Sequence, residues 1–231
     1  MSKLNTNSNA YIIIYSALLV IVVAFLLAFV SSSLKDKQEA NVKLDKEKQV
    51  LYSLNIRDKS DTEAHALFNK VVTKIDSVGE GKNRKPYVFY CEVDGQQKYV
   101  FPLQGMGLWG GISGYIALNA DKNTVFGAYF NHESETAGLG AEIKDSRAWQ
   151  EKFIGKKVFD AEGNVALSVV KNVEKPEYQV DCVTGATLTS NGVSDMLQKG
   201  FAQYRETLKA EEWAIIENDR SEPNADGEYN E

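Results

Sequence analysis

The segment PYVFYCEVDGQQKYVFPL, residues 86–103, marks the point at which the hydrophobic periodicity of the chain changes from helical to alternating. Asp94-Gly95 separates its two halves and is a strong signal for a two-residue hairpin turn, because both residues tolerate positive φ. Alternating or short apolar segments then recur between polar turns, over 111–120, 123–131, 156–163, 164–172 and 177–183. The sequence therefore predicts a mostly antiparallel sheet.

Helical patterns lie on both sides of these strands. A charged helix is expected over 33–56, and the capping box formed by Ser60 and Glu63 opens a second helix. The spacing predicts that this second helix turns one face to the core and leaves His65 on its surface. Its predicted core positions are Ala64, Phe68, Val71 and Ile75.

The C-terminal half contains one weakly predicted helix over 145–153 and one well-defined helix over 192–210. One face of the second is apolar and consists of Val193, Met196, Leu197, Phe201, Tyr204 and Leu208. With the predicted strands, this pattern indicates an α+β domain, a mostly antiparallel sheet with flanking helices.

A stretch of 21 residues without a charge, Ala10 to Val30, precedes the domain. At 1.5 Å per residue a helix of this length spans about 31 Å, which matches the apolar thickness of a bilayer. The alternative is a cleaved signal peptide, for which the apolar region is long and Ser31-Ser32-Ser33 a poor cleavage site. We therefore expect a single N-terminal transmembrane helix, whose orientation the flanking lysines do not decide.

The expected domain boundaries follow from these patterns. They are a cytoplasmic N-terminus (1–9), a transmembrane anchor (10–30), a juxtamembrane helical segment (31–78), a cofactor-binding domain (79–210) and an acidic tail (211–231). The tail has eight acidic residues and one basic residue, so the net charge of −6 for the whole chain leaves a nearly neutral body. Such a charge distribution gives no basic patch that would attract nucleic acid.

The two cysteines and two histidines do not fall at spacings typical of zinc or haem sites, so no metal site is expected. A disulfide between Cys91 and Cys182 requires an oxidising compartment, and the spacing alone does not show that the two residues are close.

Residues 105–110, GMGLWG, match the G-x-G-x-x-G pattern of dinucleotide-binding loops. That function requires a helix directly after the glycines, so that the pyrophosphate meets the helix N-terminus. The residues that follow, 111–118, alternate as a strand does. The sequence therefore argues against a nicotinamide dinucleotide at this loop.

Three segments are not explained by regular structure: QGMGLWGG (104–111), HESETAGLGAE (132–142) and DCVTGATLTSNG (181–192). The first two place Trp109 and Leu139 among glycines, where an indole either offers a platform for a flat ring or caps the core. The third contains four hydroxyl side chains and leads into the last helix. Hydroxyls and backbone N–H groups at a helix N-terminus are suited to a phosphate.

Thr184-Gly185-Ala186-Thr187, with Asp181 three residues ahead, resembles the D-x-x-[ST]-G-A-[ST] motif of the FMN-binding domain family. The longer string TGATLTSNGV, together with GLWG (107–110) and the 132–142 segment, is similar to the NqrC family of the sodium-translocating NADH:quinone oxidoreductases. A juxtamembrane pattern of Gln38, Asn41, Leu44 and Asp45 belongs to the same resemblance, which extends from the anchor to the last helix. The family usually has proline where this chain has Ala137.

The resemblance implies that FMN is attached covalently to Thr187 through a phosphoester bond made by a flavin transferase. It places Leu108, Trp109, Thr136 and Leu139 against the isoalloxazine or the ribityl chain. It places Gly185, Ala186, Leu188 and Thr189 around the phosphate. Further candidates are Thr184, Asp181 and Glu135, the last either a loop brace or a flavin contact. His132 is expected to be structural, and the resemblance implies no catalytic proton donor and no metal.

By resemblance, the protein is an electron carrier on the path from NADH to quinone, working with other subunits of a sodium-translocating complex. The same resemblance places it in the bacterial cytoplasmic membrane with residues 31–231 on the periplasmic side. Two alternatives stay open. One is the equivalent flavin subunit of an Rnf ferredoxin:NAD oxidoreductase complex, and the other is an anchored binding or tether module without a cofactor.

Overall fold

The computed structural model describes residues 8–77 and 87–209, and it divides into two units, residues 1–46 and 47–231. Helix α1, Asn9–Ser53, runs through the first unit and ends in the second. Among the described residues, α1 is the one helix long and apolar enough to cross a membrane, and its apolar window is not buried. The predicted acidic tail and residues 1–7 lie outside the described residues.

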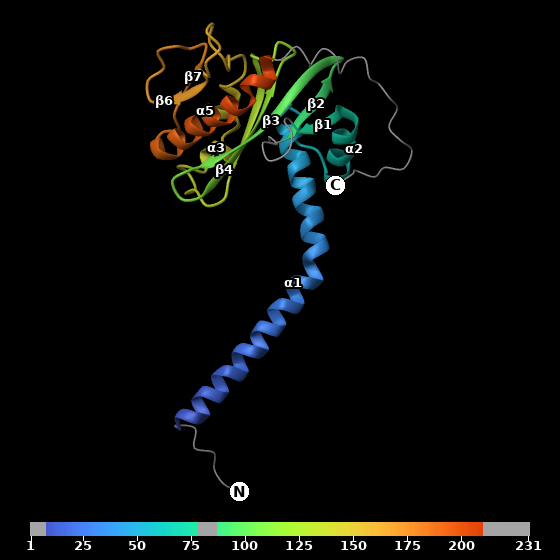
Figure 1. Cartoon of the computed structure of the whole chain (residues 1–231), viewed down its shortest axis with the longest axis vertical. Helices are drawn as coiled ribbons and strands as arrows, with labels where there is room; N and C mark the ends of the chain where they lie inside the picture. Colours follow the sequence, from blue (N-terminus) through green and yellow to red (C-terminus); the bar gives the residue numbers. More distant parts are fainter. Residues whose placement is uncertain (1–7, 78–86, 210–231) are drawn as a thin grey trace. The chain divides into compact units, whose positions relative to one another are not determined.

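The second unit is built on a five-stranded antiparallel sheet in which the strands follow one another in chain order (Figure 1). Its strands are β1 (Val72–Ser77), β2 (Tyr87–Val93), β3 (Gln96–Met106), β4 (Gly111–Leu118) and β5 (Val125–His132). Val93 pairs with Gln96, and Asp94 and Gly95 between them both have positive φ, 52° and 71°. The sheet and the hairpin predicted from the sequence are confirmed.

Helices cover both faces of this sheet. One face packs against α5 (Thr187–Lys209), with the short helices α3 (Glu142–Asp145) and α4 (Arg147–Glu151) on the same core. The other face packs against α2 (Asp61–Val71) and the last turns of α1. Alternate residues of strands β2 to β5 enter the two cores, as Tyr90 and Cys91 of β2 do. This is the physical consequence of the period-2 pattern.

The last predicted strands form a smaller structure than the sequence suggested. Only β6 (Ser168–Val170) and β7 (Gln179–Asp181) are regular within this described part of the chain, and they pair parallel to each other. Segment 156–163 contributes isolated bridges, Thr124 to Lys157 and Phe159 to Val165. These elements pack beside α5 (Figure 1) and close its core.

Two helix predictions need correction. Helical spacing places Ile75 on the core face of the second helix, but that helix ends at Val71, and Ile75 lies in edge strand β1 with 40% of its surface exposed. Pairing with β2 overrides the helical spacing there. The last helix begins at Thr187, not at Gly192. Its predicted core face is buried at every described position, and the Leu208 side chain lies outside the described residues.

Other local predictions are confirmed. The Glu63 carboxylate accepts hydrogen bonds from the Ser60 N–H at 3.0 Å and the Ser60 hydroxyl at 2.8 Å, and His65 is exposed. Cys91 and Cys182 are both free thiols. Cys91 lies in the α2 core and Cys182 against the α5 core, on opposite faces of the sheet, so the disulfide left open by the sequence does not form.

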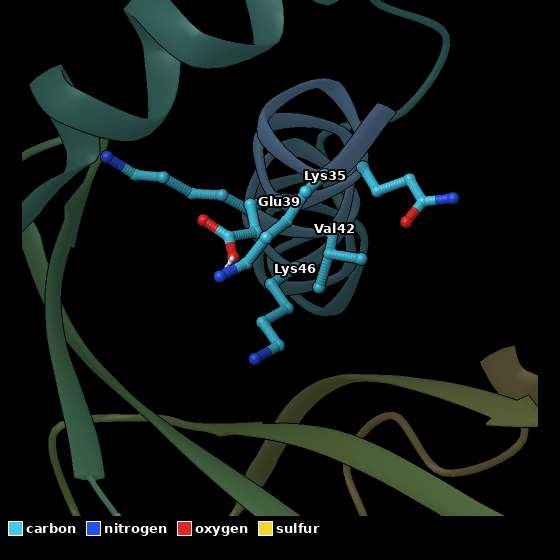
Figure 2. Close-up of a pocket in the computed structure, with 6 residues that line it drawn as sticks. Lys35, Glu39, Val42 and Lys46 are labelled. Carbon is cyan, nitrogen blue, oxygen red and sulfur yellow. Dashed lines mark ion pairs between the residues drawn. The ribbon is translucent and has the colours of Figure 1, made fainter. Parts of the chain in front are cut away.

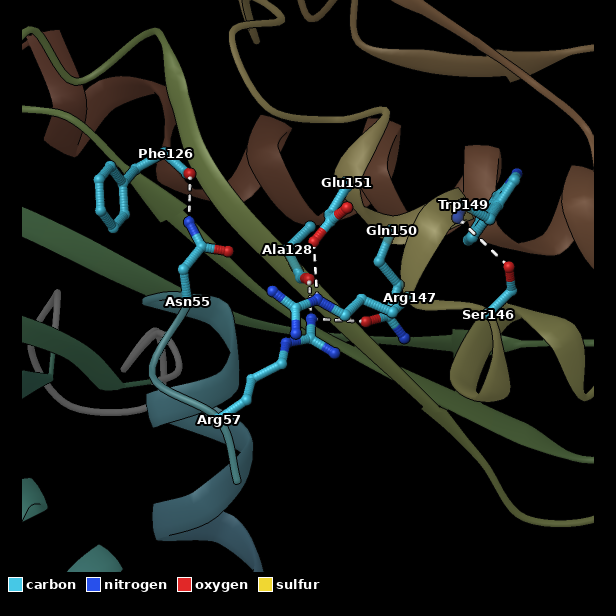
Figure 3. Close-up of polar contacts among 9 residues, drawn as sticks. All are labelled: Asn55, Arg57, Phe126, Ala128, Ser146, Arg147, Trp149, Gln150 and Glu151. Atoms are coloured by element: carbon cyan, nitrogen blue, oxygen red, sulfur yellow. Dashed lines mark hydrogen bonds and ion pairs between the residues drawn. The ribbon is translucent and has the colours of Figure 1, made fainter. Parts of the chain in front are cut away.

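The segment after α1 is fixed to the sheet by polar contacts (Figure 3). Asn55 donates to the carbonyl of Phe126 at 3.0 Å, and Arg57 donates to the Gln150 side-chain oxygen at 2.7 Å. The Arg57 guanidinium also lies within 6 Å of the rings of Tyr52 and Tyr129, at 5.7 and 5.8 Å. Burial and the neighbouring Arg147 lower the pKa of Arg57 from its usual range. These contacts connect the end of α1 to β5 and α4.

Close packing of α5 on the sheet depends on glycine. A Cβ atom on Gly192 would lie 2.3 Å from the carbonyl oxygen of Met106 at the end of β3. No side chain fits at that distance, so glycine is required for the helix to approach the strand. The first turns of α5 are thereby held beside the β3–β4 loop.

Replacing this glycine should separate helix and strand. We expect Gly192→Ala to destabilise the domain by about 1–3 kcal/mol, the usual cost of overpacking a well-packed contact. Chemical denaturation of the detergent-solubilised chain would measure it. The matched control is Asn191→Ala at the exposed neighbouring position, which should change stability by less than about 0.5 kcal/mol. Equal effects of the two variants would contradict the packing argument.

Candidate functional site

Thr187 is the first residue of α5, and its side chain is exposed. Within the described part of the chain, its hydroxyl takes part in no hydrogen bond. The first intrahelical bond runs from the Ser190 N–H to the Ala186 carbonyl at 2.9 Å, so the N–H groups of residues 187–189 have no acceptor inside the helix. An exposed hydroxyl and these N–H groups therefore share one helix end.

The turn before Thr187 is rigidly held. The hydroxyl of Ser190, which is fully buried, accepts a hydrogen bond from the Val183 N–H at 3.1 Å. The Ala186 N–H donates to the Val183 carbonyl at 3.1 Å, and Gly185 has a φ of 77°, which favours glycine. Ser190, a residue of the helix itself, therefore holds this turn in place.

Glu135 joins the three loops that the sequence left unexplained. Its carboxylate accepts a hydrogen bond from the hydroxyl of Thr189 in α5 at 2.6 Å. It accepts another from the backbone N–H of Trp109, in the β3–β4 loop, at 2.8 Å. Its own N–H donates to Nδ1 of His132 at 3.2 Å, which gives His132 the structural role expected for it. One side chain therefore connects segments 104–111, 132–142 and 181–192.

The Glu135 carboxylate is buried, with 8% of the residue exposed. Burial by itself would raise its pKa, but hydrogen bonds from Thr189 and from the backbone N–H groups of Trp109, Leu108 and Gly110 outweigh it, and the pKa is lowered. Glu135 is therefore ionised at neutral pH and acts as an acceptor only.

Space for this carboxylate is provided by two glycines. A Cβ on Gly107 would lie 2.4 Å from one carboxylate oxygen, and a Cβ on Gly140 would lie 2.4 Å from the other and 2.6 Å from the Thr189 hydroxyl. The glycines of GMGLWG thus form a hairpin turn, closed by a 2.8 Å hydrogen bond from the Gly107 N–H to the Gly110 carbonyl. This turn surrounds the Glu135 side chain of the protein itself. The next element is strand β4 and not a helix, as the sequence analysis predicted.

The same three loops expose large apolar side chains. The exposed fraction is 67% for Trp109, 46% for Leu108 and 43% for Leu139. It is 60% for Leu188, the residue after Thr187. A Cβ on Gly185 would lie 2.9 Å from the Leu139 side chain, so Leu139 lies against the turn that carries Thr187. Thr136 is exposed, and its carbonyl accepts hydrogen bonds from the N–H groups of Leu139 and Ala141, which closes this turn.

Some predicted residues are engaged elsewhere. Thr189 and Ala186 are buried, and the Thr189 hydroxyl is used by Glu135. The Asp181 carboxylate forms an ion pair with Lys152, directly after α4, with distances of 2.7 and 2.9 Å from Nζ to its two oxygens. Thr184 and Gly185 are exposed beside Thr187.

Sequence reasoning missed two members of this region. Met106, at the end of β3, is 68% exposed next to the apolar loop residues, and Lys152 fixes Asp181. An apolar residue between two loop glycines was a usable signal for Met106. Lys152 and Asp181 are 29 residues apart, so no local sequence pattern could predict their contact.

A hollow on α1 is lined by side chains of that helix alone (Figure 2). They are Lys35, Gln38, Glu39, Val42, Lys43 and Lys46. The ion pair between Lys35 and Glu39 measures 3.8 Å and joins exposed groups, so it contributes little. The predicted cofactor contacts all lie in other segments.

Comparisons with known proteins find relatives that match the same part of the chain. The model of the FMN-binding domain family matches residues 107–202, which include most of all three loops. The C subunit of the Na(+)-translocating NADH-quinone reductase of Haemophilus ducreyi is 28% identical over 91% of this chain and 98% of that relative. The protein of the same name from Pseudomonas aeruginosa is 35% identical, over 58% of this chain and 56% of that relative.

Two solved structures are also similar to the chain. The crystal structure of the protein of this name from Parabacteroides distasonis has a TM-score of 0.70 and 35% identity, covering 77% of this chain and 98% of that one. Shewanella oneidensis NqrC has a TM-score of 0.59 and 26% identity, covering 73% of this chain and 99% of that one.

The ionised Glu135 should make stability depend on pH. A glutamate whose folded pKa is lowered stabilises the fold above its unfolded pKa of about 4.3, and this contribution is lost as the pH falls through the folded value. Glu135→Gln should therefore cost roughly 1 kcal/mol more at pH 7 than at pH 3, since bonds to a charged acceptor are the stronger. Denaturation of the apoprotein at both pH values measures this. A cost that does not shrink on acidification would contradict it, and Glu174→Gln, at an exposed position outside the three loops, is the control.

Proposed function

Since the chain belongs to the NqrC family of the Na(+)-translocating NADH-quinone reductases and carries an FMN-binding domain, we propose that it is a membrane-anchored flavoprotein electron carrier of such a complex, with FMN attached covalently to Thr187. The observation that carries the proposal is the placement of Thr187. It is an exposed hydroxyl at the first residue of a helix, beside loops that expose apolar side chains.

The residues of this region fit such a group. With a flavin adenine dinucleotide as donor, the pyrophosphate P–O bond and the Thr187 Oγ–H bond break and an Oγ–P bond forms. The nucleoside monophosphate leaves with the proton, and the phosphodiester on Thr187 keeps one negative charge. The N–H groups of the first turn of α5 and the helix dipole favour an anion at this position. The nearby Glu135 opposes it, but several hydrogen bonds already occupy that carboxylate.

The apolar loop residues suit the rest of the cofactor. The exposed faces of Trp109, Leu108 and Leu139 offer contact area for a flat ring, and burying them under one would remove apolar surface from water. Bound FMN would supply the redox chemistry, while the protein fixes its place and electrostatics. Thr187 has no free hydroxyl once esterified, so its role is attachment.

Covalent attachment is tested by mass. Full-length protein co-expressed with a flavin transferase should gain the mass of FMN less one water, and the peptide 172–199 should carry it on Thr187. Thr187→Ala should abolish the gain and the fluorescent band on a denaturing gel, and Thr187→Ser should retain both. The control Thr62→Ala, exposed on α2, should behave as wild type. A wild-type chain without added mass, or FMN retained in Thr187→Ala, would overturn the proposal. Unmodified wild type would favour the cofactor-free tether.

The N-terminal part of α1 is proposed to anchor the chain, with the folded domain on the periplasmic side near partner subunits and the quinone pathway. The Rnf-type alternative is less favoured because the relatives above carry the Na(+)-translocating name.

Orientation can be tested with protease. Protease added to intact spheroplasts should digest the domain and leave a short membrane-bound fragment, because residues beyond the anchor would be accessible. A cytoplasmic marker protein should survive in the same sample. Digestion only after the membrane is broken would place the domain in the cytoplasm.

A further inference from the structure

We propose that Glu135 is a positioning residue for the flavin site: its buried carboxylate holds the first turn of α5, which carries Thr187, against the backbone of Trp109. The inference rests on the proposed attachment of FMN at Thr187. Of the two roles that the sequence left open for Glu135, a loop brace or a flavin contact, it assigns the first. It also means that the loop and the helix end are held in place before the cofactor binds.

The contacts support a direct mechanical connection. Thr189, which donates to Glu135 at 2.6 Å, is two residues after Thr187 in the same first turn of α5. Trp109, which donates through its N–H at 2.8 Å, carries the most exposed of the ring contacts predicted from the sequence. The Ser134 hydroxyl adds a bond to the Trp109 carbonyl at 3.0 Å. Loop and helix end are therefore fixed through one carboxyl group.

Glu135 is saturated by the protein's own donors. Each of its oxygens faces one strong donor and one glycine that leaves room for it, Gly107 on one side and Gly140 on the other. A group that served mainly as a flavin contact would need an accessible oxygen, but the residue is only 8% exposed. The geometry therefore favours placement of neighbours over direct contact.

Three substitutions separate the charge of Glu135 from its two hydrogen-bonded connections. In Glu135→Gln the amide oxygen can still accept from the Trp109 N–H, and the amide nitrogen can donate to the Thr189 hydroxyl, so both connections survive without the charge. Glu135→Ala removes both connections. Thr189→Val, nearly the same shape as threonine, breaks only the connection to α5.

The experiment measures the rate at which flavin transferase attaches FMN to purified full-length apoprotein, with a flavin adenine dinucleotide as donor. Intact mass follows the reaction. It is carried out well below the unfolding temperature of each variant. We expect attachment at least tenfold slower in Glu135→Ala and in Thr189→Val, and within about threefold of wild type in Glu135→Gln. The double variant Glu135→Ala/Thr189→Val should be no slower than Glu135→Ala alone, because Thr189 acts only through its bond to Glu135. Glu174→Ala, at an exposed position outside the three loops, is the control.

A second readout does not depend on the cofactor. Hydrogen exchange of the Trp109 amide should be slow in the wild-type apoprotein and in Glu135→Gln, and at least tenfold faster in Glu135→Ala. Wild-type attachment rates in folded Glu135→Ala and Thr189→Val would overturn the inference. Should Glu135→Ala fail to fold, Thr189→Val against Glu135→Gln decides. Failure of wild type itself to gain FMN would instead refute the proposed function.

Discussion

Helix α5 approaches the sheet until Gly192 touches the carbonyl of Met106, and the remainder of the site depends on this approach. It brings the N-terminal turn of α5 next to the β3–β4 loop, so that residues near 107 and 187 become neighbours. The apolar face of α5 fixes the approach through Met196, Leu197 and Phe201, which are buried in the core. A helix further from the sheet would leave Glu135 unable to reach both Thr189 and Trp109.

The three loops, 104–111, 132–142 and 181–192, are held together by the buried and negatively charged carboxylate of Glu135. Glu135 is stabilised by donors from two other segments, and its lowered pKa shows that these donors outweigh the cost of burial. Its glycine neighbours have no side chains because the carboxylate and the Thr189 hydroxyl occupy that space. A glycine pattern that resembles a dinucleotide loop thus has a different physical origin here.

The arrangement suits an electron carrier better than an enzyme that moves protons. The ionised Glu135 is buried and committed to its donors, and Asp181 is paired with Lys152. The loops expose several large apolar side chains, together with hydroxyls at a helix end. Such a surface can hold a flat cofactor and leave its chemistry to the cofactor itself.

The sequence by itself determined the local features of this protein. Alternation around Asp94-Gly95 specified the hairpin and the antiparallel sheet, and 21 uncharged residues specified an apolar helix. The phosphate site at 184–187 stays a prediction. Only the tertiary structure decided the rest. Ile75 became part of a strand because β2 was available to pair with it, and α5 began at Thr187 because Ser190 braces Val183. Glu135 and Thr189 are 54 residues apart, and their contact exists only because the packing of α5 on the sheet brings their segments together.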